Sequence, residues 1–171
     1  MSYPRQAINE AFALLPSKLD SKEVRIQHAA IGYQESLFEA RRQIVTVVRD
    51  GVKVNVPEGP AVSFWQFERG GINGVMTFYR TQVVDWAKSV CKARGVPFTV
   101  DDVWIAMQTD DVLGAAFARL LMYTDAAPVP VVQSEGWEMY VRTWRPGAYK
   151  RDPEGLRRKW QSSWAFGLEQ A

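Results

Sequence analysis

Residues 30–67 have the sequence AIGYQESLFEARRQIVTVVRDGVKVNVPEGPAVSFWQF, and this stretch decides the fold. Two runs of β-branched residues lie in it, at 44–48 and 52–56. Between the two runs stands Asp50-Gly51, a pair that favours the backbone of a two-residue hairpin turn. The stretch therefore predicts a small β-hairpin at about 44–56.

A long helix is predicted immediately before the hairpin, at about 20–40. Asp20 and Glu23 form a capping-box pattern at its start, and Leu19 with Val24 fits the hydrophobic staple that accompanies such a box. Helical spacing of apolar residues and capping signals predict further helices at 4–15, 70–79, 80–94, 99–108, 109–121, 134–143 and from 152 onward. No repeat or linker divides the chain. We therefore expect one α+β domain, predominantly helical, with a single hairpin and a helical remainder over 70–171.

Composition excludes several classes of function. The chain has 171 residues and a net charge of +2, which gives little reason to expect binding to nucleic acid. A single cysteine, Cys91, excludes an internal disulfide, and a single histidine, His28, excludes a multi-histidine metal centre. We expect no metal and no organic cofactor.

Hydropathy gives no sign of a membrane segment or a targeting segment. No apolar run approaches the ~20 residues needed to cross a bilayer, so membrane insertion is not expected. The first residues, MSYPRQAINEAFALLP, lack the basic start and apolar run of a signal peptide, and we expect no export by that route.

Glu35 is the candidate general acid. It lies late in the predicted helix, one residue from an apolar face formed by Val24, Ile31 and Phe38. Partial burial raises the pKa of a carboxyl, and the negative end of the helix dipole acts in the same direction. A carboxyl that is protonated near neutral pH can protonate a leaving glycosidic oxygen. The alternative is a helix-end residue paired with an arginine, Arg41 or Arg42.

The order of these motifs resembles a known superfamily. Gln34-Glu35-Ser36, late in a helix with small apolar residues, is similar to the catalytic helix of goose-type lysozymes and soluble lytic transglycosylases. In those enzymes a second motif follows, roughly Gly-Ala-x-Gly-(Leu/Phe)-(Met/Trp)-Gln, and residues 59–67 (GPAVSFWQF) resemble it. Ser63 stands where the family usually has glycine, and the hairpin lengthens the connection between the two motifs. Small proteins with this order look most like bacteriophage-encoded proteins that degrade peptidoglycan.

The resemblance implies a lysozyme-like fold in which Glu35 is the single catalytic acid/base. It also implies that Ser36 supports a substrate amide or the Glu35 carboxyl. A third family region is a helix that ends in Ala-Tyr-Asn-like residues facing the acid, and Tyr123 is the candidate there, although no Asn follows it. The expected substrate-binding residues are therefore Ser36, Phe64, Trp65, Gln66 and Tyr123. A place in the core is the alternative for Trp65.

Hydrolysis by a retaining or inverting route needs a second carboxylate. Glu68, directly after the second motif, is the best candidate, and Asp50 at the hairpin turn is another. Simple structural roles, at a helix start and in a turn, are the alternatives for both. If neither carboxylate reaches the groove that binds the substrate, Glu35 has to act first as the acid and then as the base. The resemblance to lytic transglycosylases implies that one-carboxyl mechanism.

The sequence thus predicts cleavage of the β-1,4 bond between N-acetylmuramic acid and N-acetylglucosamine. The expected partners are the peptidoglycan glycan strand and, for a virion protein, other phage virion proteins. The expected location is a phage virion, or the host cytoplasm before release to the periplasm. One alternative is a catalytically inactive, lysozyme-fold structural or ejection protein of a phage. Another is a DNA-binding protein that uses the basic residues of 142–159. We expect His28 to be a half-buried structural residue.

Overall fold

The structure, a computed structural model, describes residues 3–171. The described residues form eight α-helices and one two-stranded antiparallel sheet, which confirms the predominantly helical class with one hairpin. The α-helices are α1 (Tyr3–Ala13), α2 (Lys22–Ser36), α3 (Arg69–Met76), α4 (Thr81–Ala93), α5 (Val100–Ala106), α6 (Asp111–Tyr123), α7 (Gln133–Trp144) and α8 (Pro153–Gln170). Two short 3-10 helices, η1 (Ser17–Leu19) and η2 (Gly147–Lys150), precede α2 and α8.

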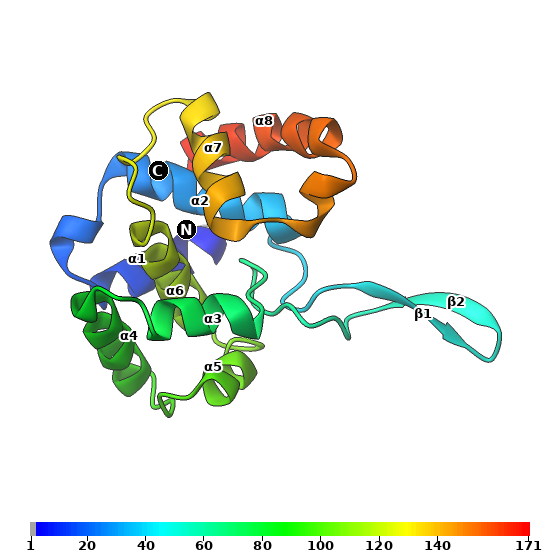
Figure 1. The fold of residues 1–171 in the computed structure, drawn as a ribbon, viewed down its shortest axis with the longest axis horizontal. Helices are drawn as coiled ribbons and strands as arrows, with labels where there is room; N and C mark the ends of the chain where they lie inside the picture. The colour runs from blue at the N-terminus through cyan, green and yellow to red at the C-terminus, as the bar shows by residue number, and fades with distance from the viewer. Residues whose placement is uncertain (1–2) are drawn as a thin grey trace.

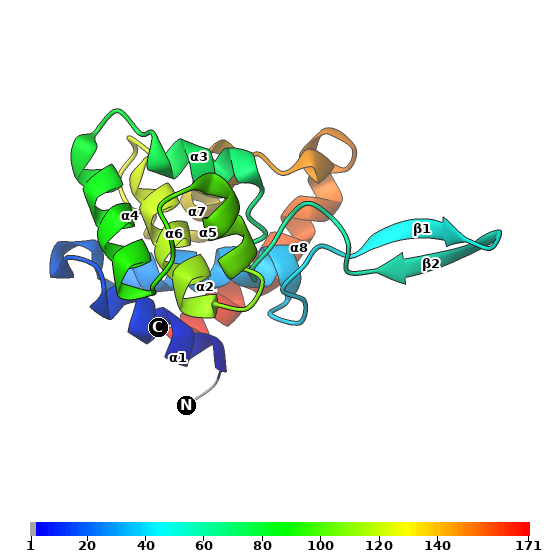
Figure 2. The ribbon, with the colours of Figure 1, turned by 90° about the horizontal axis from the view of Figure 1, so that it is seen from below.

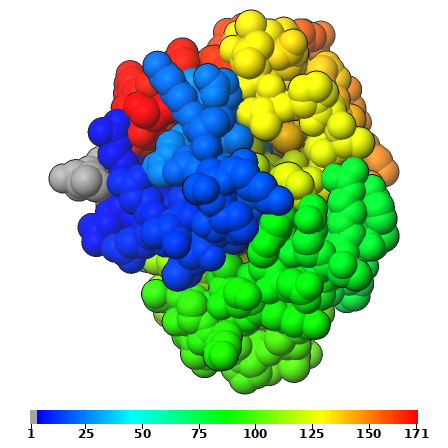
Figure 3. All heavy atoms as spheres, turned by 90° about the vertical axis from the view of Figure 1, so that its left-hand side faces the viewer, coloured from blue at the N-terminus to red at the C-terminus, as the bar shows by residue number. Residues whose placement is uncertain are grey.

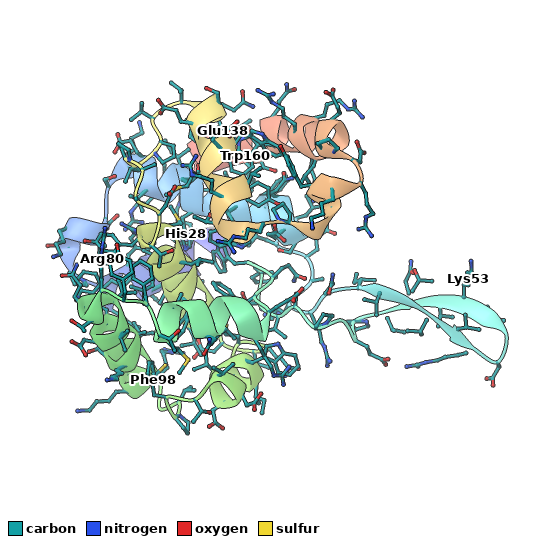
Figure 4. The ribbon with its side chains drawn as sticks, in the orientation of Figure 1. His28, Lys53, Arg80, Phe98, Glu138 and Trp160 are labelled. Carbon is teal, nitrogen blue, oxygen red and sulfur yellow. The ribbon has the colours of Figure 1, made fainter. Side chains whose placement is uncertain are left out.

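The hairpin consists of β1 (Val45–Arg49) and β2 (Val52–Val56), with Val47 opposite Val54. Asp50 and Gly51 both have positive φ, at 51° and 78°, as the tight hairpin turn predicted for this pair requires. The two strands extend away from the helices (Figures 1 and 2). Lys53, on β2, lies far out on this extension, whereas Trp160 lies among the helices (Figure 4).

Helix α2 begins slightly later than the capping pattern predicts. Ser21 is its N-cap, and the Ser21 hydroxyl accepts a hydrogen bond from the Val24 N–H at 3.3 Å. Asp20 instead forms an ion pair with Arg25, with Oδ1 and Nε 2.6 Å apart. The predicted cap at Asp20 is therefore wrong by one residue, because its carboxylate is engaged by a nearby guanidinium.

The end of α2 is also earlier than predicted. The helix stops at Ser36, and Leu37 and Phe38 adopt left-handed φ values of 55° and 57°. The chain therefore turns sharply away from the helix axis directly after Glu35 and Ser36. This turn leaves the Glu35 side chain in the last turn of the helix.

Helix α2 runs through the interior of the molecule, and α8 packs along it (Figure 1). Its residues Ala29, Ala30 and Ile31 are fully buried. They belong to one connected core that includes side chains from all eight α-helices and from residues 62–67. Figure 3 shows the face opposite the hairpin, where the N-terminal segment lies between α8 and the middle of the chain. Over residues 3–171, no helix combines the length and apolar character needed to span a bilayer.

Candidate active site

A cavity of about 540 Å³ lies at the C-terminal end of α2. One set of lining residues comes from the segment after β2 and the start of α3: Ala61, Gln66, Phe67, Glu68, Gly70 and Gly71. A second set comes from the end of α7, from the η2 region and from the first half of α8. In Figure 1, α3 lies below α7 and α8. The strands of the hairpin do not line the cavity, because they extend outward.

Glu35 lines this cavity and is half-buried. Burial raises the pKa of the Glu35 carboxyl to about 7 from an ordinary value of 4.5. A hydrogen bond from Tyr140 and the charge of Lys159 act in the opposite direction and are weaker than burial. Among the described residues Glu35 forms no ion pair, since Arg41 pairs with Asp111 at 2.9 Å and Arg42 donates to the carbonyl of Gly59. The ion-pair alternative for Glu35 is therefore wrong.

Tyr140 is the immediate partner of the candidate acid. Its hydroxyl donates to Glu35 Oε1 at 2.6 Å. The Tyr140 ring is stacked on Trp160, with centroids 5.1 Å apart and planes 11° from parallel, and Trp160 Nε1 donates to the carbonyl of Gln133. Packing between α7 and α8 therefore fixes the hydroxyl that contacts Glu35. The sequence did not predict this contact.

Helix α8 also fixes the end of α2. Gln34 is buried, and its side chain accepts a hydrogen bond from the Ser163 hydroxyl at 2.7 Å and donates to the carbonyl of Leu156 at 3.2 Å. Lys159 lines the cavity and donates to the backbone carbonyl of Gln34. These contacts hold the last turn of α2, so the position of the neighbouring Glu35 is set by α8 as well as α7.

Gln66 is the predicted substrate contact that lines the cavity. It has a left-handed backbone with φ 51°, and its amide nitrogen donates to the carbonyls of Ser63 at 2.8 Å and Ala40 at 3.3 Å. The amide oxygen has no hydrogen-bond partner within residues 3–171. A ligand could therefore meet Gln66 through that oxygen.

Ser36 is placed differently from the expectation. Its hydroxyl lies 2.8 Å from the carbonyl of Phe64 and 3.1 Å from that of Gly32, and it accepts from the N–H of Phe38. Ser36 does not line the cavity. Its hydroxyl joins the end of α2 to the second motif, and it does not contact the Glu35 carboxyl, so the implied support of that carboxyl is wrong.

The three aromatic residues predicted to bind substrate lie outside the cavity. Trp65 is 0% exposed and Phe64 is 3% exposed, so both rings belong to the core. Tyr123, at the end of α6, faces α4, where it accepts from Gln82 at 3.3 Å and contacts the ring of Trp86. Substrate contact by these three side chains is a prediction that the structure corrects, because Phe64 and Trp65 are covered by other parts of the chain and the partly buried Tyr123 lies away from the cavity lining.

Of the two candidate second carboxylates, Glu68 lines the cavity and Asp50 does not. Glu68 lines the cavity, is exposed and stands at the N-cap position of α3 without a side-chain capping bond. Asp50 lies in the turn at the end of the hairpin and does not line the cavity, so it is wrong as a second carboxylate for this site. Glu35 and Glu68 are the two carboxyl side chains among the described residues that line it.

His28 is fully buried, not half-buried as expected. Its Nε2 lies 2.8 Å from the carbonyl of Ala115, and burial lowers the pKa of the imidazole to about 3. A neutral ring that donates to Ala115 satisfies this contact. Within residues 3–171, no group of three or more His, Cys, Asp or Glu side chains is placed to hold a metal ion.

No protein-family model matches the chain, and no curated protein or solved structure is significantly similar to it. A function therefore has to be inferred from the cavity and its side chains. The cavity combines a carboxyl that keeps its proton near neutral pH, a fixed hydroxyl that stabilises the carboxylate form, and room for a ligand. This combination can give a proton to a bound group and take one back.

The first prediction concerns the hydrogen bond between Tyr140 and Glu35. This bond stabilises the carboxylate and lowers the pKa of Glu35, so Tyr140→Phe is expected to raise that pKa above about 7, by about one pH unit. Carbon-detected NMR titration of the labelled Glu35 carboxyl measures the shift without any assumption about activity. Tyr149→Phe is the control, since the rings of Tyr140 and Tyr149 both contact Trp137 but the Tyr149 hydroxyl does not bind Glu35. An unchanged or lower Glu35 pKa in Tyr140→Phe would contradict the described contact.

Proposed function

We propose that this chain is a lysozyme-like enzyme that cleaves the β-1,4 bond between N-acetylmuramic acid and N-acetylglucosamine in peptidoglycan. The observation that carries the proposal is Glu35, a carboxyl with its pKa raised to about 7 at the margin of a cavity of about 540 Å³. The resemblance of residues 34–36 and 59–67 to goose-type lysozymes and soluble lytic transglycosylases supports the choice of substrate.

In the proposed mechanism Glu35 acts twice. It first donates its proton to the glycosidic oxygen as the bond to the muramic acid C1 breaks. The carboxylate formed is stabilised by the hydroxyl of Tyr140, 2.6 Å away. Glu35 then takes the proton of the muramic acid C6 hydroxyl while that oxygen bonds to C1. The product is a 1,6-anhydro sugar, no water is consumed, and Glu35 recovers its proton.

Hydrolysis with Glu68 as the second carboxylate is the competing route. The structure favours the one-carboxyl route because Glu68 is exposed at the start of α3, where no described side chain fixes its carboxylate. A nucleophile or a base needs a fixed position near the reacting carbon. An enzyme of this kind would be carried on a phage virion, or would stay in the host cytoplasm before its release to the periplasm, where it would act.

Mass analysis of released muropeptides tests the proposal. The purified protein is incubated with sacculi from a Gram-negative bacterium, and the soluble products are separated and weighed. The expected products carry 1,6-anhydromuramic acid and are one water lighter than the products of hydrolysis. Products that have gained one water would show that the protein hydrolyses the same bond and would exclude the transglycosylase mechanism. No soluble product from correctly folded protein would favour the inactive structural or ejection protein.

A second prediction separates the roles of the two carboxyls. Under the one-carboxyl mechanism, Glu68→Gln is expected to retain activity within about threefold of the unmodified protein, because general acid–base help from that position is not used. The matched control is Glu58→Gln, an exposed carboxylate that pairs with Arg49 and lies outside the cavity lining. The rate of muropeptide release is the measurement. A loss of about 100-fold or more in Glu68→Gln alone would show that Glu68 is needed for the chemistry.

A further inference from the structure

The charged residues that line the cavity are unevenly distributed. Three cations, Arg145, Arg151 and Lys159, come from the end of α7, the η2 region and α8. The segment 61–71 contributes no cation to the lining and one carboxylate, Glu68. One side of the cavity is therefore cationic, and the cations share it with the candidate acid.

Arg145 and Arg151 are not neutralised by carboxylates of the described chain, whereas the charge of Lys159 acts on Glu35. Within residues 3–171, none of the three forms an ion pair, whereas Arg142, one turn before Arg145 on α7, pairs with Asp125 at 2.7 Å. Arg145 Nε reaches only the carbonyl of Arg142, at 3.3 Å. The guanidinium of Arg151 forms no hydrogen bond with a described residue. Uncompensated guanidinium groups at a cavity are suited to bind carboxylates in a two-pronged geometry.

The backbone at Arg145 supports a role for its side chain. Arg145 follows α7 in a left-handed conformation with φ 48°, a position that glycine occupies most easily. A non-glycine residue there carries a backbone cost, and Gln66, another residue with positive φ, also lines the cavity. Pro146 follows and fixes the turn into η2, so the arginine stays at the cavity margin.

We infer that the side of the cavity formed by Arg145, Arg151 and Lys159 is a subsite for the carboxylates of the peptidoglycan stem peptide. This inference rests on the proposed function. The muramic acid at the cleaved bond carries its peptide on a lactyl group, and the peptide has to leave the cavity on one side of the sugar strand. Carboxylates along the peptide match the cationic side, and the lining from 61–71, which holds no cation, leaves the other side to the sugars. The subsite therefore sets the direction of the strand and selects peptide-bearing glycan.

Binding measurements test this subsite apart from catalysis. The probe is a purified tetrasaccharide fragment of Gram-negative peptidoglycan that carries tetrapeptides, and its affinity is measured by calorimetry in the Glu35→Gln background, so that it is not cleaved. Adding Arg145→Gln and Arg151→Gln is expected to weaken binding about tenfold, as for the loss of two solvent-exposed ion pairs. The same fragment with its peptide carboxylates converted to amides should bind weakly and should not respond to these two substitutions.

The matched control is the pair Arg157→Gln and Arg158→Gln, which removes the same charge from α8 outside the cavity lining. Equal weakening in both pairs, no weakening in the Arg145/Arg151 pair, or no binding of the fragment at all would overturn the subsite. The proposed function is judged separately from muropeptide release. If the protein releases muropeptides but its affinity for the fragment does not depend on Arg145 and Arg151, the proposed function stands and the subsite is excluded. If the fragment binds through these arginines but no muropeptide is released, the subsite stands and the proposed function is excluded.

Discussion

Glu35→Gln is expected to lower the rate of muropeptide release by about 10²- to 10⁴-fold, the range that general acid–base catalysis contributes. Glutamine has nearly the same shape as glutamic acid, and its amide oxygen can still accept the hydrogen bond from Tyr140. It cannot donate a proton to the glycosidic oxygen, and so both halves of the proposed mechanism fail. The substitution removes the chemistry and keeps the contact between α2 and α7.

The same substitution is expected to stabilise the fold at alkaline pH. The folded pKa of Glu35, about 7, lies above its ordinary value of 4.5, so the folded state binds this proton more tightly. The stabilising contribution of the bound proton is complete below the ordinary pKa and is lost as the pH rises through about 7. Above that pH the folded state contains a half-buried carboxylate, which glutamine does not form.

Chemical denaturation at about pH 5 and about pH 8.5 measures this effect. The free energy of unfolding of Glu35→Gln, relative to the unmodified protein, should rise by about 2 kcal/mol between the two pH values. Burial also raises the pKa of Asp111, to about 6, but Asp111 is present in both proteins and its contribution cancels in the difference.

The two readouts of Glu35→Gln distinguish the competing functions. Loss of release together with higher alkaline stability supports a buried acid that works as a catalyst. Higher alkaline stability without release from either protein would leave the buried acid in place and favour the inactive phage protein. Full activity in Glu35→Gln would exclude Glu35 as the proton donor.

Signals between residues close in sequence were sufficient to predict part of the fold. The hairpin turn at Asp50-Gly51 depends on the backbone preference of two adjacent residues, and the structure has it where the sequence predicts it. The partial burial of Glu35 was also predictable from the apolar face that contains Val24 and Ile31, although Phe38, counted on the same face, lies beyond the end of α2 in the structure. Both inferences use residues close in sequence.

The partner of Glu35 could not be found in this way. Tyr140 is 105 positions away along the chain, and its hydroxyl meets Glu35 only because α7 and α8 pack together around Trp160. The motif implied Tyr123 in its place, on a helix that turns this residue toward α4. A short motif specifies residue types and order, but the direction of each side chain depends on tertiary packing.

Trp65→Ala is expected to destabilise the fold by about 3–5 kcal/mol, the usual cost of truncating a large buried aromatic residue. Trp65 is 0% exposed, its ring contacts His28 at 4.7 Å and Phe38 at 5.6 Å between centroids, and its Nε1 donates to the carbonyl of His28 at 3.0 Å. The loss would leave a cavity in the core and remove the partner of that carbonyl. Denaturant unfolding is the measurement.

Because a typical domain is stable by only about 5–15 kcal/mol, Trp65→Ala could leave little folded protein, so Trp65→Phe provides the sharper test. It keeps a ring in the core but removes the donor to His28, and an intermediate loss of about 1–3 kcal/mol is expected. The backbone carbonyl of Trp65, which accepts from Trp144 Nε1 at 2.9 Å, is unchanged, so the end of α7 should stay in place. The folded Trp65→Phe should therefore bind the peptidoglycan fragment as the unmodified protein does. A contact between Trp65 and the sugar strand would give the opposite result, with weaker binding and nearly unchanged stability.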